Sequence, residues 1–231
     1  MSLSANKVTK EILKEGYSIV DLYKKEEVSK LLNIALNDDT DVRKIGRNFN
    51  HPIYKLAVPE KVRNFLFEIA KQKCNYLPNL TSNKSLINEK NISISFAKKG
   101  PSFGNAEMSK MAFHYDDSFV NLVLPLQLPP SGSNASGLLS YVNLKKILGK
   151  NLFSRAISFI LGRNKIIRYI FKPKFLKYQC GMASIFFGDL TLHGVGSSFD
   201  GDRVSLTINL SQVSYERFYK RFYKTHKYLK K

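Results

Sequence analysis

The apolar positions of the chain follow a helical spacing in its first third and an alternating spacing after about residue 91. Residues 16–23 alternate and are rich in β-branched and aromatic side chains, which predicts a strand, and leucines at helical spacing in residues 24–37 predict a helix. A second helix is predicted over residues 59–71, where a proline stands at the start and apolar side chains share one face. We therefore expect an N-terminal region of a strand and helices over residues 8–75.

Short β-rich runs separated by clusters of Gly, Pro, Asn and Ser follow, which predicts a sandwich or barrel core over residues 91–213. The predicted strands are 92–96, 111–116, 119–126, 137–142, 182–187 and 204–210. Residues 144–177 interrupt them with apolar side chains at every fourth position, which predicts a helical insertion. Because no repeat or linker divides the chain, we expect residues 1–231 to form a single domain.

Charge is concentrated in two segments. The formal net charge is +19, and residues 145–177 hold ten Lys or Arg and no acid. Each base close to an anionic bilayer contributes roughly 1 kcal/mol of attraction. The insertion 144–177 is therefore a candidate for peripheral membrane contact or for an anionic substrate, although a solvated lid has the same composition. Residues 214–231 predict a basic helix with its aromatic side chains along one face. Such a face is typical of core packing or of a dimer interface, and the alternative is a surface that binds nucleic acid or a membrane.

No stretch reaches the roughly 18 uncharged apolar residues of a membrane span, and the first sixteen residues lack the apolar run of a signal peptide. The two cysteines, Cys74 and Cys180, are far apart and have no CxxC spacing, which indicates neither a disulfide framework nor a thiolate zinc site. We therefore expect a cytoplasmic protein.

Three potential metal ligands lie on predicted strands. Residues i and i+2 of a strand face the same side, so His114 and Asp116 can direct an imidazole and a carboxylate to one point, whereas Asp117 faces the other way. His193 ends another β-rich run and supplies a third ligand. Two histidines and a carboxylate occupy one face of octahedral Fe(II) and leave three positions open for a co-substrate and O2. A hydrolytic zinc site could use similar ligands.

A carboxylate-binding pair follows the last of these ligands. Arg203 stands ten residues beyond His193, across a predicted hairpin turn at Asp200-Gly201, and alternation places Arg203 and Ser205 on one face of a strand. A guanidinium fork and a hydroxyl can together hold a carboxylate. The distal carboxylate of 2-oxoglutarate requires such a site, which favours an iron oxygenase over a hydrolytic zinc enzyme.

The HxD step at residues 114–116, then His193, then Arg203, resembles the pattern of the Fe(II)/2-oxoglutarate-dependent dioxygenase superfamily. The Gly-Asp step at residues 188–189 is similar to that of its phytanoyl-CoA hydroxylase-like branch, and the resemblance covers residues 10–213. It implies a mainly β fold with flanking helices (α+β), whose core is a double-stranded β-helix, the cupin-like jelly-roll. The iron would lie at one open end of this core, and the N-terminal helices would pack against its outside.

The resemblance also implies an activity and its cofactors. Such enzymes hold Fe(II), here through His114, Asp116 and His193, and bind 2-oxoglutarate, here through Arg203 and Ser205. With O2 they oxidise a C–H bond while 2-oxoglutarate becomes succinate and CO2. We expect hydroxylation of an anionic small-molecule or lipid-linked substrate. Halogenating relatives replace the carboxylate ligand with a small residue, so the presence of Asp116 argues against halogenation, while desaturation and cyclisation stay open.

Two other functions fit parts of the pattern. The basic charge alone suggests a nucleic-acid-acting oxygenase. Repair oxygenases of the superfamily, however, usually carry another Arg six residues after the first, and this chain has Asn209 there. The sequence therefore disfavours nucleic acid as a partner. A non-catalytic cupin-like binding module is the non-enzymatic alternative, yet no ligand of the motif is missing. Asn121 and Tyr141 are further candidates for contacts to the 1-carboxylate or the substrate, with plain packing as the alternative. Nothing in the sequence sets the oligomeric state.

Overall fold

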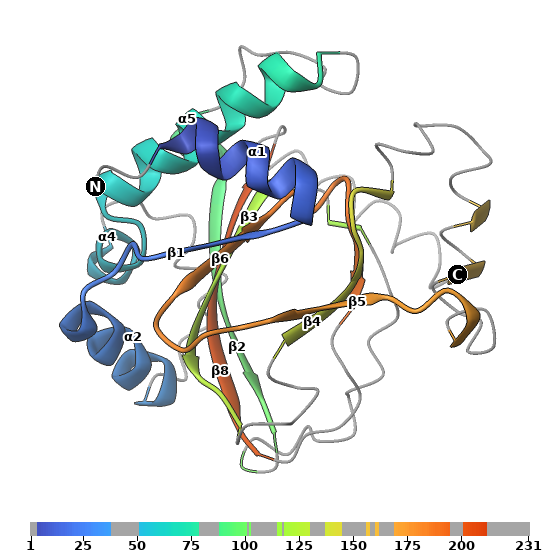
Figure 1. The fold of residues 1–231 in the computed structure, drawn as a ribbon. Helices are drawn as coiled ribbons and strands as arrows, with labels where there is room; N and C mark the ends of the chain where they lie inside the picture. Colours follow the sequence, from blue (N-terminus) through green and yellow to red (C-terminus); the bar gives the residue numbers. More distant parts are fainter. Residues whose placement is uncertain are drawn as a thin grey trace, which may run out of the picture.

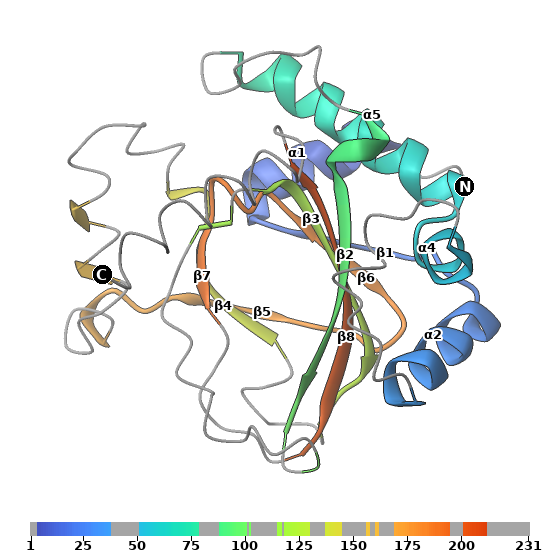
Figure 2. The ribbon, with the colours of Figure 1, turned by 180° about the vertical axis from the view of Figure 1, so that it is seen from behind.

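The computed structural model contains two β-sheets and helices beside them (Figures 1 and 2). The described residues are 4–37, 51–78, 88–100, 102, 115–116, 118–129, 137–144, 156–157, 160–161, 169–194 and 201–211. The elements are α1 (Ala5–Glu15), β1 (Ser18–Val20), α2 (Lys25–Asn37), α4 (Pro52–Ala57), α5 (Glu60–Tyr76), the short 3-10 helix η2 (Glu89–Asn91), β2 (Ile92–Lys99), β3 (Ser118–Gln127), β4 (Gly137–Tyr141), β5 (Lys174–Lys177), β6 (Ala183–Phe186), β7 (Leu192–Gly194) and β8 (Arg203–Ser211).

The strands form two sheets that face each other (Figure 2). Five strands in the order β1-β6-β3-β8-β2 make the larger sheet, and three in the order β5-β4-β7 make the smaller one. Every pair of neighbouring strands is antiparallel. The chain passes from the larger sheet at β6 to the smaller at β7 and back at β8, which is the winding of a jelly-roll. The predicted mainly β architecture with flanking helices, a double-stranded β-helix, is confirmed.

Strand β8 shows why the larger sheet has two different faces. Successive side chains of a strand point to opposite sides. One set, Val204, Leu206, Ile208 and Leu210, is fully buried in the main apolar cluster together with residues of α1, α2 and α5. The other set is polar and consists of Arg203, Ser205, Thr207 and Asn209. The helices therefore cover the apolar face, and the polar face is turned toward the smaller sheet (Figure 1).

A second, smaller apolar cluster joins the two sheets. Val123 of β3 and Phe186 of β6 meet Leu138 of β4, Leu176 of β5 and the nearby Tyr178. All five side chains are buried. This cluster closes one part of the interior between the sheets and leaves the polar residues of the larger sheet beside it.

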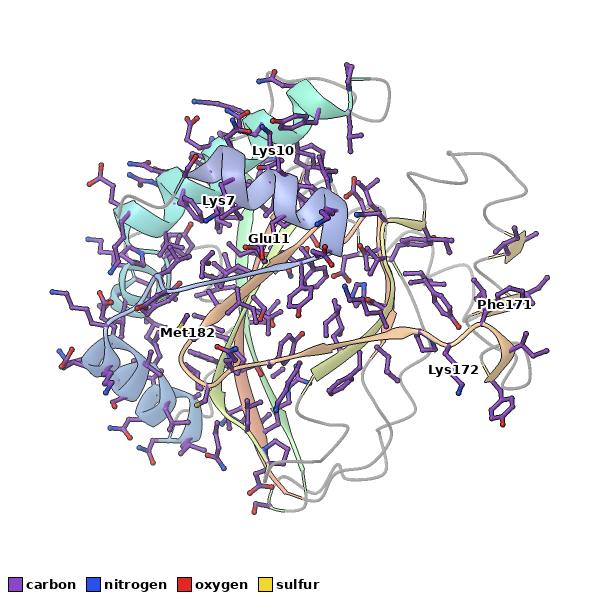
Figure 3. All side chains as sticks on the ribbon, in the orientation of Figure 1. Lys7, Lys10, Glu11, Phe171, Lys172 and Met182 are labelled. Carbon is purple, nitrogen blue, oxygen red and sulfur yellow. The ribbon has the colours of Figure 1, made fainter. Side chains whose placement is uncertain are left out.

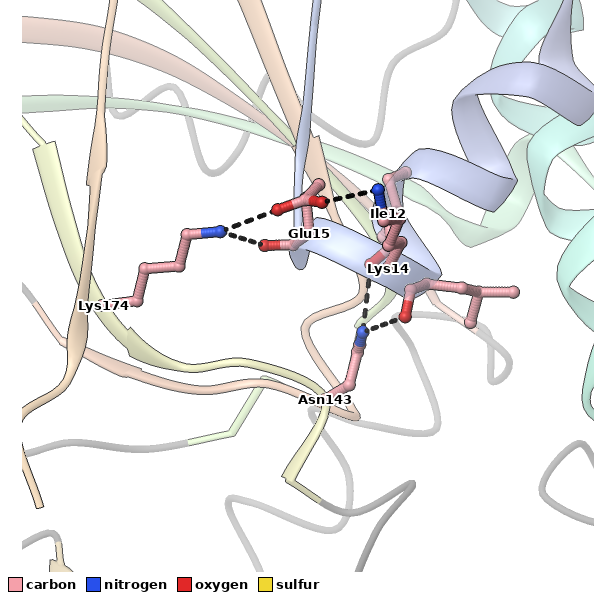
Figure 4. A network of polar contacts seen from close by, with 6 residues as sticks. Ile12, Lys14, Glu15, Asn143 and Lys174 are labelled. Carbon is pink, nitrogen blue, oxygen red and sulfur yellow. Dashed lines mark hydrogen bonds and ion pairs between the residues drawn. The ribbon is translucent and has the colours of Figure 1, made fainter.

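Helix α1 is fastened to the smaller sheet at its C-terminal end (Figure 4). The helix ends at Gly16, whose φ of 91° is the left-handed conformation that glycine adopts most readily and whose N–H donates to the carbonyl of Ile12 over 2.9 Å. Asn143, just after β4, donates its side-chain amide to the same carbonyl over 3.0 Å. Lys174 of β5 donates to the Glu15 carboxylate over 3.1 Å, and its side-chain hydrogen bond is the main reason why the pKa of Glu15 lies below its usual value.

The sequence missed or misplaced several of these elements. Helices α1 and α4 were not predicted, and α5 continues to Tyr76, beyond the predicted end at residue 71. The predicted helical insertion 144–177 extends too far, because its last four residues form β5 and pair with β4. Pro173 stands immediately before β5 and has no N–H for a continuing helix, and a four-residue edge strand is too short to show an alternating pattern.

The hairpin predicted across Asp200-Gly201 is wrong, because β7 lies in the smaller sheet and β8 in the larger. A Gly-containing turn signal marks a change of direction but does not specify which strand becomes the partner. Residues 111–114 of a predicted strand and the helix predicted at 214–231 lie outside the described residues, and the domain boundaries stay predictions. Among the helices of the described ranges, none has the length and apolar character needed to cross a membrane.

Candidate metal centre

Asp116 and His193 approach each other at the end of the space between the sheets. Asp116 lies two residues before β3, and His193 is in β7 of the smaller sheet. Their Oδ2 and Nε2 atoms are 3.3 Å apart, and the His193 side chain is 6% exposed. His114, the third predicted ligand, lies outside the described residues, and so does Asp117, the neighbouring carboxylate that alternation placed on the opposite face from Asp116. Within the described part of the chain, no group of three His, Cys, Asp or Glu side chains comes together, so two of the predicted ligands are placed.

The orientation of His193 suits a metal ligand. Its Nδ1 lies 3.0 Å from the carbonyl oxygen of Thr191. Because a carbonyl can only accept, this contact requires the proton on Nδ1 and leaves Nε2 of the neutral ring with a lone pair directed toward Asp116. The ring packs edge-on against Phe186, with centroids 5.1 Å apart.

Asp116 is held by the turn between β6 and β7. Its backbone N–H donates to the carbonyl of Gly188 over 3.1 Å. The side-chain amide of Asn121 donates to Asp116 Oδ2. A Cβ at residue 188 would lie 2.8 Å from both Asp116 Cβ and Asn121 Oδ1, closer than real Cβ contacts come. Gly188 is therefore required for the close approach of this turn to the carboxylate, and Asn121 contacts the candidate ligand directly.

Arg203 and Ser205 lie together on the inner face of β8, as alternation predicted. Arg203 Nε donates to Ser205 Oγ over 3.1 Å, and Nη1 donates to the carbonyl of Gly137 over 3.5 Å. Arg203 is 6% exposed and Ser205 is fully buried. The guanidinium carbon lies 4.9 Å from the ring centroid of Tyr178. A buried guanidinium beside a hydroxyl is suited to a carboxylate of a ligand.

Tyr178 belongs to this site, although nothing in the sequence pattern pointed to it. Burial raises the pKa of the Tyr178 phenol, the Arg203 guanidinium opposes this rise, and the Asp116 carboxylate adds to it. The phenol therefore stays protonated at neutral pH and can donate a hydrogen bond. Because both Arg203 and Asp116 act on its pKa, Tyr178 lies within electrostatic range of both parts of the site.

The inner faces of the sheets carry buried polar atoms that have no hydrogen-bond partner among the described residues. These atoms are Asn121 Oδ1, Ser140 Oγ, Ser184 Oγ and Asn209 Oδ1. Ser140 is opposite His193 in the strand register, and Asn121 is opposite Asn209. An unsatisfied buried polar group costs about 1–3 kcal/mol, so four of them on facing surfaces indicate a polar ligand or ordered water between the sheets.

Tyr141 is not part of this face. It pairs with Leu192, next to the Ser140–His193 pair, so alternation puts its side chain on the opposite face of the smaller sheet. Its hydroxyl donates to the carbonyl of Phe171 over 2.7 Å. Its hydroxyl is thus directed to Phe171 and not to the face that carries His193, and of the two extra candidates Asn121 is the one that contacts Asp116.

Two facing antiparallel sheets with a polar interior, and with a carboxylate and an imidazole at one end, define a double-stranded β-helix with a candidate metal centre. Solved Fe(II)/2-oxoglutarate oxygenases share this fold with the chain.

A prolyl-4-hydroxylase from Pseudomonas putida matches with a TM-score of 0.51 and 12% identity over 90% of this chain and 94% of its own. The alpha-ketoglutarate-dependent epimerase SnoN from nogalamycin biosynthesis matches with a TM-score of 0.55 and 12% identity, over 90% and 83%. A 2OG-Fe(II) oxygenase-family oxidoreductase from Burkholderia pseudomallei matches with a TM-score of 0.53 and 9% identity, over 93% of both chains. No family model and no curated protein matches the sequence. At these identities the likeness establishes the fold, and the phytanoyl-CoA hydroxylase-like branch stays a prediction.

Proposed function

We propose that this protein is an Fe(II)- and 2-oxoglutarate-dependent dioxygenase that hydroxylates its substrate with release of succinate and CO2. The observation that carries the proposal is the pairing of Asp116 with His193 at 3.3 Å in a chain that also holds Arg203 against Ser205 at 3.1 Å. The first pair suits a metal and the second a carboxylate, and both lie in a jelly-roll fold. The unsatisfied polar atoms on the inner faces support the presence of a ligand between them.

Each residue has a role in this proposal. His114, Asp116 and His193 would hold the metal, which together with 2-oxoglutarate and O2 supplies the oxidant for a C–H bond. The Thr191 carbonyl keeps the His193 proton on Nδ1, and Asn121 fixes one oxygen of Asp116. The distal carboxylate of 2-oxoglutarate would be bound by Arg203, Ser205 and the Tyr178 hydroxyl. The buried guanidinium supplies the charge that a dicarboxylate needs once it leaves water.

Anaerobic reconstitution tests the proposal. Adding Fe(II) and then 2-oxoglutarate to the metal-free protein should produce the weak visible metal-to-ligand charge-transfer band of a chelated 2-oxo acid, and admitting O2 should yield succinate. Zn(II) in place of Fe(II) is the control and should give neither signal. A band without succinate would favour the cupin-like binding module, and the lack of both would contradict the proposal.

We further propose that the substrate is an anionic small molecule or a lipid-linked molecule, met at a membrane surface through residues 144–177. The supporting observation is a run of exposed apolar side chains next to bases. Tyr169, Ile170 and Phe171 are 76%, 66% and 61% exposed, and the Lys172 ammonium lies 5.7 Å from the Tyr169 ring centroid. Figure 3 shows Phe171 and Lys172 at the edge of the molecule, away from α1, α2 and α5. Apolar side chains next to basic residues suit the headgroup region of an anionic bilayer.

Vesicle sedimentation checks this second proposal. The protein should pellet with phosphatidylserine-containing vesicles at low salt, less at high salt, and little with phosphatidylcholine alone. Replacing Tyr169, Ile170 and Phe171 by serine should weaken binding roughly tenfold or more, because three buried apolar side chains are lost. Leu36→Ser removes an exposed apolar side chain of α2 and is the matched control. Equal binding by the triple variant, or preferential binding to an oligonucleotide, would contradict the proposal.

A further inference from the structure

Lys73 is the one lysine among the described residues whose side chain is buried. It comes from α5, on the outer face of the larger sheet, and is 0% exposed. Its ammonium donates to the Asp189 carboxylate over 2.5 Å and to the carbonyl of Phe119 over 2.8 Å. The same ammonium lies 3.7 Å from the ring centroid of Phe119 and 4.4 Å from that of Phe187. The Lys73 ammonium therefore lies in the apolar layer between helix and sheet, where Asp189 is its ion-pair partner and two phenylalanine rings are in contact with it.

The partner of Lys73 belongs to the turn that holds Asp116. Asp189 follows Gly188, and its backbone N–H donates to the carbonyl of Ser118 over 3.1 Å, while the Gly188 carbonyl accepts from the N–H of Asp116 over 3.1 Å. Two hydrogen bonds therefore join this turn to the start of β3 on both sides of residue 117. The turn then continues directly into β7, which carries His193. Both described candidate ligands are adjacent to it.

Packing alone does not explain a lysine at this position. The other buried side chains of α5 include Val62, Leu66, Ile69 and Ala70, which fill the same layer without any charge. Taking an ammonium out of water is costly, and a buried ion pair generally adds little net stability compared with apolar residues of similar size. A directional pair, however, specifies one arrangement of the groups that it joins, whereas apolar contacts tolerate sliding.

We propose that Lys73 is a positioning residue of the metal centre. Its ion pair with Asp189 fixes the Gly188–Asp189 turn, and this turn holds Asp116 at the right distance from His193. This inference rests on the proposed function. It assigns to helix α5, which lies outside the sheets, a part in forming the site between them.

Titration of the metal-free protein with Co(II), a probe of the metal site that does not react with O2, tests the inference. Lys73→Met keeps most of the side-chain volume but removes the ammonium. We expect its Co(II) dissociation constant to rise roughly tenfold, the lower end of the range for groups bonded directly to metal ligands, because Lys73 acts through the turn. We also expect the visible ligand-field bands of bound Co(II) to shift, which reports a changed coordination geometry. The control is Leu66→Ala, which opens a cavity in the same helix–sheet layer but leaves the Lys73–Asp189 pair in place.

The outcomes are distinct. Folded Lys73→Met protein with wild-type Co(II) affinity and bands would overturn the inference, as would an equal loss of affinity in Leu66→Ala. If Lys73→Met does not fold, Asp189→Asn takes its place. The amide oxygen of that variant can still accept a hydrogen bond from Lys73, but the charge that holds the ammonium is gone. Unchanged Co(II) affinity in that variant would also overturn the inference. Lys73→Arg, which retains a cation, should recover part of the lost affinity. If the wild-type protein itself binds no Co(II), it is the proposed metal centre that fails.

Discussion

His193→Ala should remove tight Fe(II) binding and with it all formation of succinate. The imidazole is buried, its proton is fixed on Nδ1 by Thr191, and Nε2 faces Asp116 at 3.3 Å. The described residues contain no cluster of three potential ligands that could replace it. Loss of an outer partner of a ligand already costs about 10–100-fold in metal affinity. We therefore expect the loss of a ligand itself to exceed the upper end of that range, measured by titration with Fe(II) under anaerobic conditions.

The matched control for this variant is His51→Ala. His51 caps helix α4, where its Nδ1 accepts from the N–H of Ile53 over 3.2 Å. Its loss should lower the free energy of unfolding by about 1 kcal/mol, as for other N-caps, and leave Fe(II) affinity unchanged. Wild-type Fe(II) affinity in His193→Ala would remove His193 from the metal centre, whereas equal losses in both variants would show a general effect of instability.

Arg203→Ala should weaken 2-oxoglutarate binding while Fe(II) stays bound. Arg203 is 6% exposed and lies between Ser205, Tyr178 and the carbonyl of Gly137, so a carboxylate there would be held in a desolvated site. Truncating one partner of a buried charge pair typically costs about 2–5 kcal/mol. That range corresponds to an increase in the dissociation constant of roughly thirtyfold or more, measurable by anaerobic titration of the charge-transfer band.

Arg203→Lys separates charge from geometry. The lysine keeps the positive charge but cannot form a planar two-pronged contact, so we expect an affinity between those of the wild type and Arg203→Ala. Arg63→Ala is the control, because Arg63 pairs with Glu60 and Glu89 on the exposed side of α5. Wild-type affinity for 2-oxoglutarate in Arg203→Ala would assign the carboxylate to a different residue.

Sequence reasoning worked best where a local period decides the geometry. The shared face of Arg203 and Ser205 followed from alternation within one strand, and the contact between them confirms it. The same alternation sets the apolar residues of β8 on the opposite face, where they pack on the helices. The approach of Asp116 to His193 joins two sheets, and only the resemblance to a known pattern indicated it. Whether these side chains hold Fe(II) and 2-oxoglutarate stays a prediction until the variants above are measured.

The sequence was least informative where the partner of a segment is set by tertiary structure. Strand β5 has one buried side chain, Leu176, and is a strand because β4 pairs with it. Lys73 has the spacing of a buried helix position but the charge of a surface residue, and its burial becomes tolerable through the Asp189 carboxylate and the Phe119 carbonyl, which lie far from it in the sequence. Tyr178 follows an edge strand without any motif, and its role arises from the guanidinium against its ring.

The division of β8 into an apolar and a polar face has a consequence for how such a protein can evolve. Val204, Leu206, Ile208 and Leu210 contribute to folding, whereas Thr207 and Asn209 between them face the interior and are only half-buried. A substitution at either of the latter two positions changes what lines the interior and leaves the helix-facing layer intact. Selection can therefore alter the choice of substrate on one side of a strand while the other side preserves the stability of the scaffold.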